Sequence, residues 1–114
     1  MFEQRKYTRF NAEGRVTIYP KDNPSFSIRA GLADISMLGL GAYSQDKLEP
    51  GTDIRFVIIN KFSEKPIIGE GRIRYCKGFR KIDTEMFRIG IEFTAVDNET
   101  VEGVLKRIQK EGQA

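Results

Sequence analysis

Two short motifs contain the residues whose types and spacing could do chemistry. The first is Arg5-Lys6-Tyr7-Thr8-Arg9, which places two arginines four residues apart near the N-terminus. An arginine guanidinium can pair bidentately with a phosphate, or with the O6 and N7 atoms of a guanine. In a chain this rich in arginine the spacing is expected about once by chance, so on its own it also fits a solvated basic run.

The second motif places Asp34, Ser36 and Gly39 at fixed spacing, as D-x-S-x-x-G. An aspartate can accept hydrogen bonds from guanine N1 and N2, a serine can reach a base edge or a phosphate oxygen, and a glycine lets the backbone approach a ligand. The simpler interpretation is a polar turn between strands. Together the motifs predict a pocket for an anionic guanine nucleotide, with positive charge on one side and base recognition on the other.

The chain is long enough for one domain and one hydrophobic core, so we expect a single domain over residues 1–114. The apolar runs are too short to cross a bilayer, and the charged N-terminus does not resemble a secretory signal. A single cysteine, Cys76, cannot form an internal disulfide, which fits a reducing compartment. We therefore expect a cytoplasmic protein with no membrane segment.

The composition excludes several classes of chemistry. With no histidine and one cysteine, the chain cannot build a Cys/His zinc site, a Ser-His-Asp triad or a Cys-His dyad. It also lacks the glycine-rich phosphate loops of common nucleotide enzymes. Most hydrolase chemistries are therefore excluded, and we expect no metal or cofactor.

Positive charge is modest overall but clustered. The net charge of +3 does not by itself indicate a protein that binds nucleic acid. A barrel that binds oligonucleotides needs aromatic residues on its surface. This chain has no tryptophan, and its phenylalanines lie mostly on the apolar faces of the predicted strands. We therefore expect no DNA or RNA partner. A second basic cluster either joins the N-terminal arginines in one basin or forms ordinary solvated surface. It comprises Arg72, Arg74, Lys77, Arg80 and Lys81.

Apolar residues alternate with polar ones through most of the chain, which predicts strands. Turn signals separate them at residues 20–24, 46–52, 60–66 and 77–84. The spacing predicts an all-β fold with a C-terminal helix, in which residues 13–95 form a small antiparallel barrel or sandwich and residues 1–12 form a mobile arm that folds over an anion. The alternating positions are Val16 and Ile18; Phe26 to Leu32; Leu38, Leu40 and Ala42; Ile54, Phe56 and Ile58; Ile67 to Tyr75; and Phe87 to Phe93.

Residues 97–111 have the pattern of an amphipathic helix. Asp97 or Asn98 can cap its N-terminus. Its apolar stripe either packs on the barrel or meets a partner protein or a second copy, so the chain could be a monomer or a homodimer. The stripe consists of Val101, Val104, Leu105 and Ile108.

The order of these features resembles the PilZ domain family. The two motifs are followed by a G-x-I-x-Y segment at Gly71–Tyr75 and a G-I-E-F segment at Gly90–Phe93. A strand at Arg15–Ile18 and the Leu40-Gly41-Ala42 continuation of the second motif also match, so the resemblance covers roughly residues 4 to 96. It implies a six-stranded β-barrel with a C-terminal helix.

The resemblance also implies a function and a site. Family members generally have no catalytic activity and are receptors for the bacterial second messenger cyclic di-GMP. We expect this chain to bind that ligand and to transmit the signal to a downstream protein. By this resemblance, Arg5 and Arg9 hold the guanine and phosphate groups of the ligand on one side. On the other side lie Asp34, Ser36 and Gly39.

Three further positions qualify that expectation. Gln4 stands where many members have another arginine, which favours one bound ligand over an intercalated pair. Tyr75 stands where many have a tryptophan, and either stacks on a guanine or is a surface aromatic. Lys6 either contacts a phosphate or is solvated. The alternative function is a protein-interaction module that keeps the fold without the ligand.

Overall fold

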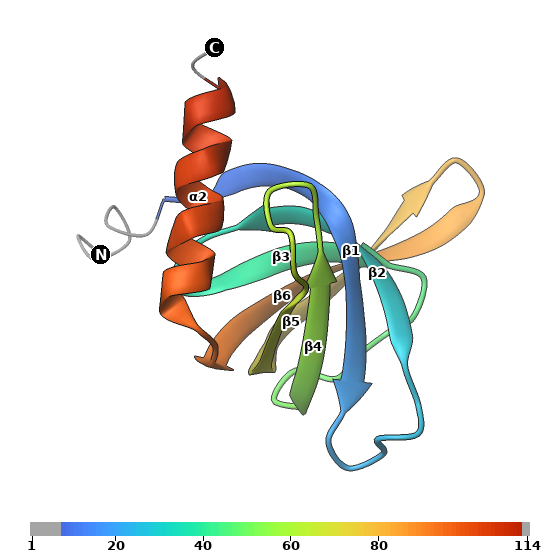
Figure 1. Cartoon of the computed structure of the whole chain (residues 1–114). Helices are drawn as coiled ribbons and strands as arrows, with labels where there is room; N and C mark the ends of the chain where they lie inside the picture. Colours follow the sequence, from blue (N-terminus) through green and yellow to red (C-terminus); the bar gives the residue numbers. More distant parts are fainter. Residues whose placement is uncertain (1–7, 113–114) are drawn as a thin grey trace.

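The computed structural model describes residues 8–112, in which six antiparallel strands close into a barrel with one helix beside it (Figure 1). The order of strands around the barrel is β1-β2-β3-β6-β5-β4. The predicted six-stranded barrel with a C-terminal helix is therefore confirmed. The elements are β1 (Phe10–Pro20), β2 (Ile28–Ile35), β3 (Gly39–Ser44), β4 (Asp53–Ile59), β5 (Ile67–Lys81), β6 (Thr84–Ala95) and α2 (Asn98–Gly112).

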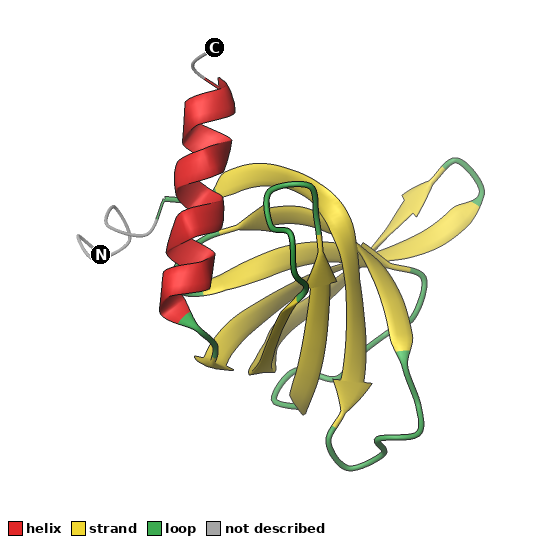
Figure 2. Ribbon diagram, in the orientation of Figure 1, coloured by secondary structure: helices red, strands yellow, loops and turns green. Residues whose placement is uncertain are grey.

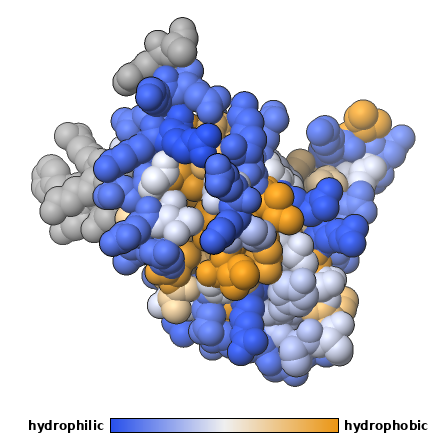
Figure 3. Space-filling view, viewed as in Figure 1, coloured by the Kyte–Doolittle hydropathy of each residue, from blue (hydrophilic) through white to orange (hydrophobic). Residues whose placement is uncertain are grey.

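The barrel forms because each strand turns one set of alternating side chains inward. In β4 the inward residues Ile54, Phe56 and Ile58 are fully buried, and Phe56 packs on Phe93 of β6 with ring centroids 5.3 Å apart. Closure pairs every strand with two neighbours, so most backbone polar groups are satisfied within the sheet (Figure 2). In the view of Figure 3 much of the outer surface is hydrophilic, as the alternation requires, and an apolar patch lies near the middle of the view.

The start of the barrel differs from the sequence prediction. β1 begins at Phe10, three residues before the expected boundary, because Phe10 pairs with Ile35 and Asn11 with Asp34 of β2. Ala12, expected in the mobile arm, is buried. The register shifts between Asn11 and Gly14, so the first residues of β1 form a bulged part of the sheet and do not belong to an arm.

The largest difference lies at residues 77–84, where the sequence predicts a turn. β5 continues to Lys81 and β6 begins at Thr84, so only Ile82 and Asp83 form the turn. These strands extend past the barrel as a hairpin (Figure 1). Cross-strand pairing overrides the turn-forming composition of this stretch. Two residues expected in strands, Phe26 and Leu38, instead lie outside them and are exposed.

The C-terminal helix packs on the barrel through its apolar stripe. Val101, Val104 and Leu105 are buried, and Arg107 donates a hydrogen bond of 3.1 Å to the carbonyl of Phe62. Asp97 caps the helix, since its carboxylate accepts hydrogen bonds from the backbone of Glu99 and the hydroxyl of Thr100. Packing on the barrel is therefore the correct alternative, and the helix begins and ends one residue later than predicted. Across residues 8–112, no helix has both the length and the apolar character needed to cross a membrane.

Candidate functional site

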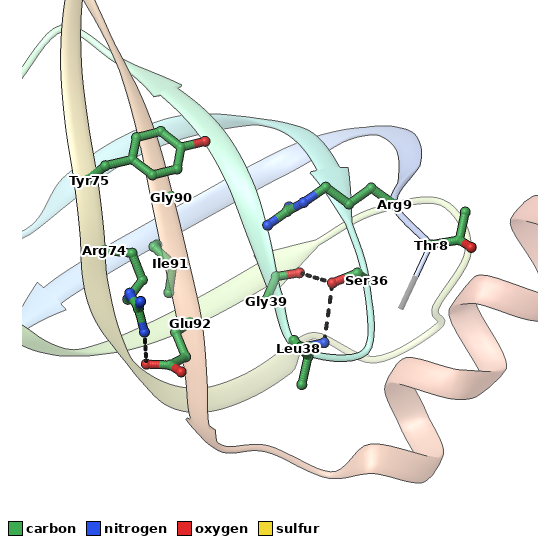
Figure 4. A pocket seen from close by; sticks show the side chains of 10 residues that line it. All are labelled: Thr8, Arg9, Ser36, Leu38, Gly39, Arg74, Tyr75, Gly90, Ile91 and Glu92. Carbon is green, nitrogen blue, oxygen red and sulfur yellow. Dashed lines mark hydrogen bonds and ion pairs between the residues drawn. The ribbon is translucent and has the colours of Figure 1, made fainter. Parts of the chain in front are cut away.

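A pocket of about 620 Å³ opens where the start of β1 meets the β2–β3 turn and the middle of β5 and β6 (Figure 4). Four segments that are distant in the sequence contribute to it, because β3, β6 and β5 are neighbours in the barrel and the start of β1 lies beside β2. The lining residues are Thr8, Arg9, Ser36, Leu38, Gly39, Arg74, Tyr75, Gly90, Ile91 and Glu92.

Arg9 lines the pocket and is paired with Asp34. Its guanidinium donates a hydrogen bond of 2.7 Å to Asp34 Oδ1, and the side chains of the two residues are 49% and 14% exposed. The pairing of Phe10 with Ile35 places Arg9 next to the end of β2. The sequence suggested that Arg9 and Asp34 face each other across a ligand. In the structure they contact each other directly, and Asp34 does not line the pocket.

Arg88 of β6 holds the other oxygen of Asp34, and the sequence analysis missed it. Its guanidinium donates a hydrogen bond of 2.5 Å to Asp34 Oδ2 and lies 5.1 Å from the centroid of the Tyr43 ring. Partial burial opposes the charge, but hydrogen bonds with Asp34 and Tyr75 outweigh it and hold the pKa of Arg88 above its ordinary value. Asp34 is thus fixed between two arginines.

The hydroxyl of Ser36 is used inside the β2–β3 turn. It is buried, accepts a hydrogen bond from the backbone of Leu38 and donates one to the carbonyl of Gly39. The backbone N–H of Ser36 also donates to that carbonyl, at 2.8 Å. The simpler interpretation of this motif, a polar turn between strands, therefore describes these contacts, and the turn presents Leu38 to the pocket.

Gly39 is required by packing against β6. A Cβ atom at this position would lie 2.0 Å from the carbonyl oxygen of Ile91, a contact that side chains do not make. The sequence argument assigned the glycine to close approach of a ligand. The structure gives a different reason, which is close approach of the neighbouring strand, although Gly39 still lines the pocket.

Tyr75 forms an aromatic wall of the pocket. Its ring lies against Gly90, where an added Cβ atom would be 2.2 Å from the ring. Figure 4 shows the side chains of Tyr75 and Arg9 reaching toward each other. A bulge in β5 between Ile73 and Tyr75 sets the position of the ring. The pocket therefore combines a planar aromatic group with a guanidinium.

The second basic cluster does not form a single basin with Arg9. Arg74 lines the pocket, but it is paired with Glu92 at 3.1 Å (Figure 4). Arg72 is paired with Asp53 at 3.0 Å and does not line the pocket. The remaining members lie on the hairpin beyond the barrel. The prediction of solvated surface is correct for most of this cluster.

The sequence matches the family model of the PilZ domain over residues 3–109, which is nearly the whole chain. This chain belongs to the PilZ domain family. Among curated proteins, none matches the sequence.

Several solved structures share the fold. The PilZ domain with c-di-GMP of YcgR from Escherichia coli has a TM-score of 0.78 at 16% identity, and the match covers 96% of this chain and 95% of that one. The structure of YcgR in complex with c-di-GMP, also from Escherichia coli, gives 0.76 at 19% identity. The inhibitor of motility MotI/DgrA from Bacillus subtilis gives 0.74 at 20% identity. This chain spans about half the length of those last two proteins, 48% and 51% respectively.

The first motif of this PilZ domain lies only partly in the described region. Arg5 and Lys6 fall outside residues 8–112, whereas Thr8 and Arg9 line the pocket. Of the predicted site residues, the structure brings together Arg9, Ser36, Gly39 and Tyr75. Asp34 accepts a hydrogen bond from Arg9 but does not line the pocket.

Proposed function

We propose that this PilZ domain protein is a non-enzymatic cytoplasmic receptor that binds cyclic di-GMP and signals to a protein partner. One observation carries the proposal: Arg9 of the first motif and Ser36 and Gly39 of the second line the same pocket, although about 25 residues separate the motifs. The c-di-GMP complexes named for YcgR, which has the same fold, support the choice of ligand.

Arg9 is the residue proposed to bind phosphate. A guanidinium has five N–H donors, and the pair with Asp34 uses one of them. The pair is half exposed on the side of Arg9, so it contributes little to stability and can open at low cost. A phosphate can therefore share or replace the carboxylate as the partner of Arg9.

Tyr75 and Asp34 are the residues proposed to recognise the guanine. Stacking of a base on a tyrosine ring contributes about 1–3 kcal/mol. The side chains of Tyr75 and Arg9 reach toward each other in the pocket, so a guanine could stack on the ring while the guanidinium contacts a neighbouring group of the ligand. Asp34 supplies carboxylate oxygens that can accept hydrogen bonds from guanine N1 and N2 if Arg9 moves to the phosphate.

Arg5 and Lys6 are assigned to the same site from the motif alone. We propose that Arg5 binds a guanine or phosphate group together with Arg9 and that Lys6 adds a phosphate contact. Gln4, in place of a further arginine, favours one ligand for each domain. The downstream partner in this proposal is a protein.

The test is isothermal titration of the purified protein with cyclic di-GMP, beside GTP and the linear dinucleotide. The proposal predicts saturable binding selective for the cyclic form, lost in Arg9→Glu and retained in Arg29→Glu, an exposed arginine of β2 outside the pocket. Equal binding by Arg9→Glu would show that the site is wrong. No binding at about 100 μM by heat and by a second probe would favour the ligand-free interaction module.

A further inference from the structure

The hairpin that extends β5 and β6 beyond the barrel is built around an exposed apolar tip. Ile82 is 89% exposed and has a φ of 59°, a left-handed conformation that β-branched residues rarely adopt. Figure 3 shows an apolar tip on a projection whose flanks are mostly hydrophilic. Core packing does not account for a strained, solvated isoleucine, and backbone strain of this kind clusters at functional sites.

The two faces of the hairpin differ in charge. On β5, Lys77, Phe79 and Lys81 alternate onto one face, and Phe79 lies opposite Met86 of β6. Phe79 also contacts Tyr43 of β3, with ring centroids 5.8 Å apart. We use the name hairpin outer face for the surface formed by Lys77, Phe79, Lys81, Met86 and the neighbouring Tyr43. It presents two lysines and three apolar or aromatic groups, with no carboxylate of the hairpin among them.

The opposite face of the hairpin is electrically balanced. There Arg80 lies directly across from Glu85 in the register of the two strands. Positive charge on the hairpin that lacks an opposite partner is therefore concentrated on the outer face.

Contacts connect the hairpin outer face to the pocket by two routes. In the shorter one, the ammonium of Lys77 lies 5.8 Å from the ring centroid of Tyr75, which lines the pocket. The longer route runs from Arg9 through its carboxylate partner to Arg88, whose guanidinium lies over Tyr43. A ligand that moved Arg9 or Tyr75 would thus act on side chains that support this face.

We propose that the hairpin outer face docks an acidic, apolar-containing segment of the downstream protein. The inference rests on the proposed receptor function, since it names the surface that delivers the signal. Charge complementarity decides the chemistry of the partner, because the two lysines have no carboxylate opposite them on the hairpin and suit carboxylates of the partner. Phe79 and Tyr43 are 37% and 43% exposed, and they suit apolar side chains that lie between those carboxylates.

A lipid surface and a nucleic acid fit the hairpin less well. Residues 77–85 hold three cations and two carboxylates, so the long-range attraction to a polyanion is weak. Ile82 is the only apolar residue of the two-residue turn, and one apolar side chain at the tip buries too little area for stable insertion into a bilayer.

The test uses a labelled 12-residue peptide of alternating glutamate and leucine, followed by fluorescence anisotropy on the full chain. Controls are the same peptide with lysine for glutamate, vesicles containing anionic lipid, and a single-stranded oligonucleotide. We expect binding of the glutamate peptide, weakened about tenfold by Lys81→Glu and further by Phe79→Ser with Lys81→Glu. Lys47→Glu, at an exposed lysine outside the hairpin, should have little effect. Saturating cyclic di-GMP should change the peptide affinity of the parent protein.

Several outcomes would overturn the docking face. One is equal peptide binding by Lys81→Glu and Lys47→Glu, and another is stronger binding to the vesicles or the oligonucleotide than to the peptide. Titration of the parent with cyclic di-GMP separates the two proposals. A parent that binds the nucleotide while Lys81→Glu leaves peptide binding unchanged contradicts the docking face alone. A parent that binds the peptide through this face but not the nucleotide contradicts the receptor function alone.

Discussion

Replacement of Arg88 should lower both the free energy of unfolding and the affinity for cyclic di-GMP. Its side chain is 25% exposed and that of Asp34 is 14% exposed, so the pair is largely withdrawn from water. We expect Arg88→Gln to lower the free energy of unfolding by about 1–3 kcal/mol, because a partly buried carboxylate loses its closer partner. Cyclic di-GMP affinity should fall as well, since Arg88 orients Asp34.

Urea denaturation of Arg88→Gln beside Arg72→Gln measures this effect. Arg72 pairs with Asp53 at the surface, where both side chains are about half exposed, so its loss should cost under about 0.5 kcal/mol. Equal stability of the two variants would contradict the special position of Arg88.

At the scale of residues, the sequence predicted the composition of the site better than its contacts. Arg9 and Tyr75 could be selected because their side-chain chemistry suits a guanine nucleotide. The pairing of Asp34 with Arg88 could not be predicted, because 54 residues separate them and β6 comes near β2 only by pairing with β3, which lies between the two. Gly39 lines the pocket, but the neighbour that requires a glycine there is the carbonyl of Ile91 and not a ligand.

At the scale of elements, the cap of α2 makes the stability of the protein depend on pH. The hydrogen bond from Thr100, with backbone hydrogen bonds from Glu99 and Thr100, outweighs desolvation and lowers the pKa of Asp97 from its ordinary value of 3.8. A lowered pKa in the folded state gives stability that is present above pH 3.8 and is lost as pH falls through the folded value.

Asp97→Ala should therefore lower the melting temperature at pH 7, and by less below pH 3. Asp97→Asn is the control, because an asparagine cap does not titrate. Thermal unfolding by circular dichroism at a series of pH values measures both. A destabilisation by Asp97→Ala that is the same at pH 2 and pH 7 would contradict the role of the charged cap.

The turn of the hairpin makes a second prediction at this scale. Ile82 is the first residue of a two-residue turn and has a positive φ, which favours glycine or asparagine over a β-branched residue. Ile82→Asn should raise the free energy of unfolding by roughly 0.5–1 kcal/mol, since asparagine tolerates this conformation. Urea denaturation measures it, and a loss of stability would show that the isoleucine packs usefully where it is.

Strands could be predicted where apolar and polar residues alternate regularly. They could not be predicted where the local sequence favours a turn but pairing with a distant strand keeps the backbone extended. The inward residues of β4 alternate cleanly, and their burial follows. Residues 77–84 carry turn-forming residues, yet pairing between Lys77 and Arg88 and onward to the tip keeps them extended. The strand at Phe10 was also missed, because pairing with Ile35 is not visible in a polar local sequence.

At the scale of the whole molecule, the receptor function predicts stabilisation by the ligand with no change of fold. The closed barrel has its core on the inside, whereas the pocket opens on the outside of β3, β6 and β5. Cyclic di-GMP at about 100 times its dissociation constant should add about 2.7 kcal/mol, which raises the melting temperature by roughly 10 °C. Scanning calorimetry measures the rise, and Arg9→Glu should show none.

The most direct test of the central claim is a two-dimensional amide NMR titration with cyclic di-GMP. Binding at the pocket predicts that the largest shifts occur at Arg9, at residues 36–39, at Tyr75 and at residues 90–92. The paired segments of β1 and β4, residues 15–20 and 54–59, lie outside the pocket and should change little. Shifts concentrated in β1 and β4, or none at saturating nucleotide, would contradict the account.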